Sequence, residues 1–225
     1  MKTGECNRRD FVALAGAGAI AAAAGSAGAT AATGEGKALR IVGIACSPRK
    51  GMTTARAVRA ALDGAASVGA RIQTELIDLG GMSIAGWSPE PPKDDMEAIL
   101  EKLKDPALGG LIIGSPSYFR GISSLCKAFI ERCSPLREPT MVLADKPVGV
   151  VAVGGFRNGG QELVIEQVQA AMLCFGMVPV GGKAPAFQGA TLMSAKDEIA
   201  QDELGLDTAK KVGIHVAELA LRLMG

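Results

Sequence analysis

The feature that most constrains the fold is an alternation, from residue 39 onward, between short apolar runs rich in β-branched residues and longer amphipathic stretches. The short runs have the length of buried strands, and the longer stretches repeat their apolar residues at helical spacing. This alternation is typical of βαβ units, in which helices join consecutive parallel strands. It predicts an α/β domain with a doubly wound parallel sheet.

Five strands and five helices are expected. The strands are 39–46, 71–79, 110–115, 147–154 and 177–180, and the helices are 53–68, 94–104, 123–133, 161–175 and 207–223. In a doubly wound sheet, ligands bind beyond the carboxyl ends of the strands. The loops after the first, third and fourth strands are therefore the expected site.

The beginning of the chain has a different composition. Arg8 and Arg9 precede a run of alanine and glycine over residues 13–24, and Ala-x-Ala sequences follow it. These are features of a secretory signal peptide, and the paired arginines indicate the twin-arginine route. An uncleaved membrane anchor is the alternative, but the run is less apolar than the ~20 residues of a typical span.

We therefore expect residues 1–32 to be a twin-arginine signal peptide, residues 33–37 a linker and residues 38–225 the folded domain, with no stable membrane anchor. The mature protein would then work in the periplasm or as an exported protein. The formal charge of +1 is nearly balanced. It argues against nucleic acid as a partner, because binding to a polyanion requires a basic surface.

Four cysteines follow the signal: Cys46, Cys126, Cys133 and Cys174. They show no Cys-x-x-Cys spacing. Cys126 and Cys133 lie two turns apart on one predicted helix, about 10 Å along its axis, which is too far for a disulfide between them. Buried packing is the default expectation for all four, although export would permit disulfides.

The loop over residues 47–54 reads Ser-Pro-Arg-Lys-Gly-Met-Thr-Thr and leads into a helix. Free backbone amides, the positive end of the helix dipole and hydroxyl donors together favour a phosphate there. The loop lacks both the Walker pattern and the Gly-x-Gly-x-x-Gly pattern of dinucleotide sites. A polar turn with Thr53 or Thr54 as a helix cap is the alternative.

The loops after the third and fourth strands offer other ligand contacts. Residues 114–124 place Tyr118 beside Phe119 at the sheet edge, where aromatic rings can lie against a flat ligand or cover the sheet. Residues 154–162 contain four glycines, which let the backbone approach a ligand closely. A bare turn is the alternative for this glycine-rich loop.

Together these loops resemble the NADPH-dependent FMN reductase and iron–sulfur flavoprotein family. The motifs are Ser-Pro-Arg-Lys-x-x-x-Thr after the first strand, Gly-Ser-Pro-x-Tyr-Phe and Lys-Ala-Phe-Ile-x-Arg around the third, and Gly-Gly-x-Arg-x-Gly-Gly-Gln-Glu after the fourth. The likeness covers residues 39–182. It implies FMN as the cofactor and a flavodoxin-like fold with strand order 2-1-3-4-5 and helices on both faces.

In that family the first loop holds the FMN phosphate, the second lies along the isoalloxazine ring, and the third contacts the ring and the ribityl chain. By motif position, the resemblance implies these cofactor-binding residues: Ser47, Arg49, Thr53 and Thr54; Pro116, Ser117, Tyr118 and Phe119; and Gly155, Arg157 and Gly160.

Iron–sulfur members of the family carry a compact cysteine cluster between the second strand and the second helix. The corresponding residues here, 84–96, contain no cysteine. Because an iron–sulfur cluster needs thiolate ligands, we expect FMN alone and no metal.

His215, the only histidine, lies away from the three loops and is expected to be structural. The acidic start of the second helix is expected to complement the helix dipole; it comprises Asp94, Asp95, Glu97 and Glu101.

The resemblance implies an enzyme that transfers a hydride from NAD(P)H to FMN and then reduces an acceptor such as a flavin or a quinone. The chemistry belongs to the cofactor, so no catalytic residue of the chain is predicted. A flavodoxin-like electron carrier outside the inner membrane is the alternative, and a binding protein with a decayed flavin site is a third reading. Relatives of this type form dimers or tetramers, so a homodimer or homotetramer is expected, with small-molecule or protein electron donors and acceptors.

Overall fold

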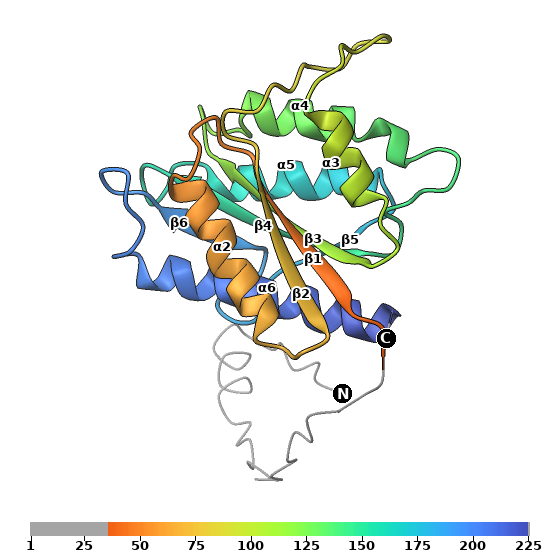
Figure 1. The fold of residues 1–225 in the computed structure, drawn as a ribbon. Coiled ribbons are helices and arrows are strands. Elements are labelled where there is room, and N and C mark those ends of the chain that lie inside the picture. Colours follow the sequence, from red (N-terminus) through yellow and green to blue (C-terminus); the bar gives the residue numbers. More distant parts are fainter. Residues whose placement is uncertain (1–35, 225) are drawn as a thin grey trace, which may run out of the picture. The chain divides into compact units, whose positions relative to one another are not determined.

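The computed structural model describes residues 36–224, which form three layers (Figure 1). A parallel sheet lies in the middle. One face carries α2 (Thr53–Ala66) and α6 (Glu203–Met224). The other carries α3 (Met96–Leu103), α4 (Ser124–Arg132) and α5 (Gln161–Leu173), with a single 3-10 turn, η1 (Ser134–Leu136), after α4. No helix in this part of the chain is long and apolar enough to span a membrane.

The sheet has the strand order β2-β1-β3-β4-β5, which confirms the predicted order. The strands are β1 (Leu39–Ala45), β2 (Ile72–Asp78), β3 (Leu108–Pro116), β4 (Pro147–Gly154), β5 (Val178–Val180) and β6 (Ala190–Met193). All neighbours pair in parallel. Every residue of β3 and β4 is buried, as expected for central strands covered on both faces.

Strand β6 was not predicted, so the sheet has six strands where five were expected. β5 pairs with the first residues of β4, and β6 pairs with its last residues, so the two short strands share one edge of β4. The sequence of β6, Ala-Thr-Leu-Met, is too short to show a period. The other elements agree with prediction within a few residues, and the largest shift is at α6, which begins at Glu203.

Two apolar cores hold the layers together, one on each face of the sheet. Phe129, Met96 and Leu103 are buried in the core beneath α3, α4 and α5. Val58 and Leu62 of α2 pack in the core shared with α6. Each such side chain contributes about 1.5–3 kcal/mol when it is fully buried.

Helices α2 and α6 cross at very close range, because two glycines meet the opposing backbone. A Cβ atom on Gly213 would stand 1.7 Å from the carbonyl oxygen of Ala61, and one on Gly64 would stand 2.3 Å from that of Lys210. Only hydrogen fits at these two positions. The crossing fixes the position of α2, whose amino end follows the loop after β1.

Replacing Gly213 with alanine tests this crossing. The added methyl group has no space and must push the two helices apart, so Gly213→Ala should lower the free energy of unfolding by about 1–3 kcal/mol. Gly69→Ala is the matched control, because a Cβ atom there would meet nothing within 4 Å. Denaturant unfolding measures both variants, and an unchanged stability for Gly213→Ala would contradict the close crossing.

Candidate functional site

The parallel register brings the loops after β1, β3 and β4 to the same edge of the sheet, and hydrogen bonds join them there. Ser123, between β3 and α4, donates its hydroxyl to the carbonyl oxygen of Cys46 at 2.6 Å. Ser117, after β3, donates its hydroxyl to the carbonyl oxygen of Gly159, after β4, at 2.6 Å. The three predicted loops therefore form one continuous surface.

The amino end of α2 is not capped by a side chain. Its N-cap residue is Met52, not a threonine, and the first turn contains no acidic residue. The first amides of a helix have no partner within the helix, and the helix dipole makes this end positive. Ser47, Thr53 and Thr54 are all buried beside it. These donors fit a phosphate monoester.

Two side chains hold the loop after β1 in place, one from β2 and one from the loop itself. Asp78, at the end of β2, accepts hydrogen bonds from the amides of Gly51 at 2.7 Å and Gly80 at 3.0 Å. The hydroxyl of Ser47 accepts a hydrogen bond from the amide of Arg49 at 3.2 Å. The loop after β1 is thus held both by Asp78 of β2 and by a hydrogen bond of its own.

A pocket of about 200 Å³ opens between these loops. Its lining includes the predicted residues Arg49, Thr53, Pro116, Ser117, Tyr118 and Gly155. Val153, Gly154, Ser194 and Asp197 complete the lining and were not predicted. The volume lies below the roughly 300–1,000 Å³ of usual small-molecule sites.

Phe119 does not line this pocket in the structure. Phe119 and Arg120 both have positive φ, 51° and 65°, and the backbones of Tyr118 and Gly121 exchange two hydrogen bonds of 3.0 Å. This is the geometry of a tight hairpin turn of type I′, and it leaves Phe119 fully exposed at the tip. The glycine at position 160, φ 90°, is the N-cap of α5 and lies behind this turn.

Arg157, which was predicted to contact the cofactor, forms an ion pair with Asp202 in the structure. Its Nη2 atom lies 2.8 Å from Oδ1 of Asp202, whose side chain is 3% exposed. Asp202 also accepts hydrogen bonds from the amides of Met193 and Gly205. Burial alone would raise the pKa of Asp202, but these donors hold it below its usual value. Arg157 thereby joins the loop after β4 to the segment after β6.

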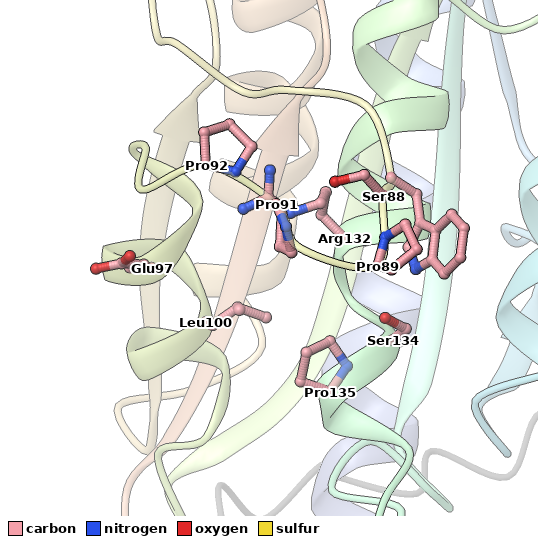
Figure 2. A pocket seen from close by; sticks show the side chains of 10 residues that line it. Ser88, Pro89, Pro91, Pro92, Glu97, Leu100, Arg132, Ser134 and Pro135 are labelled. Carbon is pink, nitrogen blue, oxygen red and sulfur yellow. The ribbon is translucent and has the colours of Figure 1, made fainter.

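A second cavity, of about 290 Å³, lies under the proline-rich loop between β2 and α3 (Figure 2). Arg132 lines it and is buried, with its guanidinium bound to both carboxylate oxygens of Asp94 at 2.7 and 3.0 Å. Asp94 also accepts the amide of Met96, as expected for a residue at a helix start. Although burial alone would raise the pKa of Asp94, Arg132 and backbone amides keep it lowered. This ion pair was not predicted, because its members lie 38 positions apart in the sequence.

Three of the four cysteines are buried as expected, and the expectation for Cys174 is wrong because this residue is exposed. Burial, together with Cys126 nearby, raises the pKa of the thiols of Cys46 and Cys133.

His215 lies on α6, and its Nδ1 atom forms a hydrogen bond of 2.6 Å with the carbonyl oxygen of Gly181. Among residues 36–224, no three acidic, histidine or cysteine side chains are placed to bind a metal ion.

Comparisons with known proteins match the chain to flavoproteins. The family model for NADPH-dependent FMN reductase matches residues 39–191. An iron–sulfur flavoprotein of Methanocaldococcus jannaschii is 36% identical over 80% of this chain and 97% of its own length. Another, from Methanosarcina thermophila, is 32% identical over 77% of this chain and 93% of its own length.

Solved structures give the same fold. The flavodoxin-type WrbA-like protein of Agrobacterium tumefaciens superposes with a TM-score of 0.59, over 83% of this chain and 99% of its own, at 19% identity. This likeness shows that the fold is flavodoxin-like. It agrees with the strand order and with helices on both faces of the sheet.

Replacing Asp94 with asparagine tests the buried ion pair. The variant leaves the charge of Arg132 buried without its partner, so the free energy of unfolding at pH 7 should fall by about 3 kcal/mol. Because the folded-state pKa of Asp94 is lowered, its charge contributes stability above the unfolded pKa of about 4 and loses it as the pH falls through the folded value. The deficit of the variant should therefore shrink in acid.

Glu101→Gln is the control, since it breaks only an exposed pair with Lys104 and should cost less than about 0.5 kcal/mol. Denaturant unfolding of both variants at neutral and acidic pH gives the comparison. Equal losses for Asp94→Asn and Glu101→Gln would show that the buried pair has no special role.

Proposed function

This chain belongs to the NADPH-dependent FMN reductase family, and we propose that its FMN binds in the pocket at the amino end of α2. The chain is accordingly an FMN-dependent oxidoreductase that uses NAD(P)H as electron donor. One observation carries the proposed position of the cofactor. The amino end of α2 has no side-chain cap and no acidic residue, and it lies among buried hydroxyl groups.

The residues of the pocket divide according to the parts of FMN. Thr53, Arg49 and the first amides of α2 would hold the phosphate, because they are the positive and donating groups of the site. Pro116, at the end of β3, and Tyr118, in the loop after it, offer apolar faces for the ring. The backbone at Gly155 would approach the ligand closely, since no atom occupies the space where its Cβ would stand.

Bound FMN would supply the redox chemistry, a two-electron exchange in which a hydride is taken from NAD(P)H and two electrons with their protons are passed to an acceptor of the flavin or quinone type. The chain binds and orients the cofactor. The loops after β3 and β4 would provide backbone groups for hydrogen bonds to the ring. No side chain is assigned as a proton donor.

We propose FMN as the only resident cofactor, without an iron–sulfur cluster. The segment between β2 and α3 contains no cysteine, and the ion pair of Asp94 with Arg132 fixes it to α4. Iron and sulfide analysis of the purified protein tests this, and stoichiometric amounts of both would contradict it.

Export is proposed from residues 1–32, which lie outside the described part of the structure. The paired arginines and the alanine-rich run support it. Detection of the mature protein in the cytoplasm alone would contradict it.

We propose a homodimer or homotetramer. Phe119 and Phe156 are strongly exposed, at 106% and 79%, on two loops that touch through Arg120 and Asn158. Large apolar side chains gathered at one place often mark a surface between proteins. Light scattering measures the mass in solution, and a monomer would contradict the proposal.

Replacing Arg49 with glutamine tests the phosphate position. The variant removes a charged donor, so the affinity for FMN should fall at least about tenfold, as for a lost charge-assisted hydrogen bond. The affinity for riboflavin, which has no phosphate, should stay nearly unchanged. Arg59→Gln, a change at an exposed position of α2, is the control. Flavin fluorescence titration measures all three proteins, and an equal loss for FMN and riboflavin would place the phosphate elsewhere.

The activity is tested by adding NADPH or NADH to the FMN-loaded protein without oxygen. We expect the visible flavin bands to bleach with at least one donor and to return when a quinone or free flavin is added. Bands that persist with both donors, in a protein that chemical reductants do bleach, would contradict the NAD(P)H-dependent activity.

A further inference from the structure

A short turn after β6 reaches back to the loop that leads into α2. Ala195 and Glu198 exchange backbone hydrogen bonds of 2.9 and 3.0 Å, and the two residues between them, Lys196 and Asp197, have positive φ of 50° and 60°. Residues other than glycine rarely adopt a positive φ. When they do, the backbone strain often occurs beside functional sites. The turn lies beyond the residues matched by the family model, which end at 191.

Two ion pairs fix this turn to α2 and its loop. Asp197 Oδ1 lies 2.6 Å from Arg49 Nη1, and Glu198 Oε2 lies 2.8 Å from Arg56 Nη1. The two pairs differ in position, because Arg49 and Asp197 both line the pocket at the amino end of α2. Arg56 lies in the first turn of α2 and does not line that pocket.

The pair of Arg49 and Asp197 opposes the charge of a bound phosphate. The hydrogen bond from Arg49 to Asp197 is the main reason why the pKa of this guanidinium is raised. A phosphate at the amino end of α2 would compete with Asp197 for the same guanidinium. It would also be repelled by the carboxylate, and like charges a few ångströms apart near a protein surface cost on the order of 1 kcal/mol or more.

We propose that Asp197 sets the affinity of the phosphate site, because its carboxylate lowers the affinity for every phosphate so that inorganic phosphate alone binds there only weakly. This rests on the proposed position of the FMN phosphate. The same penalty acts on every phosphate, but FMN also contacts the loops after β3 and β4 through its ring. Inorganic phosphate has no such contacts, so only FMN binds tightly enough to displace Asp197 from Arg49.

The test compares Asp197→Asn with wild type, both freed of flavin, in titrations with FMN and riboflavin and with inorganic phosphate as competitor. Asparagine removes the charge and also tolerates positive φ, so the turn should be kept. We expect FMN to bind about three- to tenfold more tightly to the variant. Phosphate should inhibit FMN binding at a correspondingly lower concentration, and riboflavin binding should not change.

Glu198→Gln is the matched control, because it removes the same charge from the same turn but frees Arg56. Glu198→Gln should not change the affinity for FMN, riboflavin or inorganic phosphate. Two results would overturn the proposal. A loss of FMN affinity in Asp197→Asn would mean that Asp197 orients Arg49 for the phosphate, and an equal gain in Glu198→Gln would mean that only the net charge matters. If wild type binds FMN and riboflavin equally, the phosphate position itself is wrong.

Discussion

The placement of α2 against the sheet is the constraint on which the site depends. A parallel sheet collects the carboxyl ends of β1, β3 and β4 at one edge, and α2 begins where β1 ends. Its close crossing with α6, at Gly64 and Gly213, leaves little freedom to move. The uncapped amides at its start are therefore held toward the loops after β3 and β4. A phosphate that binds there places the remainder of its molecule against those loops.

Three of the ion pairs between arginine and aspartate fix loops, namely those of Arg49, Arg132 and Arg157. The pairs Arg132–Asp94 and Arg157–Asp202 each contain a buried carboxylate. The first joins α4 to the loop before α3, and the second joins the loop after β4 to the segment after β6. Arg49 with Asp197 is more exposed and lies in the pocket. Buried pairs are costly to break, whereas exposed pairs contribute little stability. The two pairs with a buried carboxylate therefore hold the loops in place, whereas the exposed pair of Arg49 and Asp197 is the one for which we propose that a bound phosphate competes.

The sequence predicted the layers of this fold well, because buried parallel strands are continuous apolar runs and their helices show a clear period. It located the loops of the site for the same reason, since in this architecture the strand ends define them. Strand β6 escaped prediction because four residues carry no period. The partners of Arg49 and Arg157 escaped because ion pairs between distant segments leave no local pattern. The exposed position of Phe119 depends on a turn in which Phe119 and Arg120 both have positive φ. The sequence of this turn does not predict that conformation.

The central claim is that the amino end of α2 binds the phosphate of FMN. Nitrogen–proton correlation spectra of the protein, recorded with FMN and then with riboflavin, test it most directly. We predict that FMN shifts the backbone amide signals of Thr53, Thr54 and Ala55, and that riboflavin leaves these unchanged while shifting signals from the loops after β3 and β4. Equal shifts of the α2 amides with both ligands, or no shift with FMN, would contradict the claim.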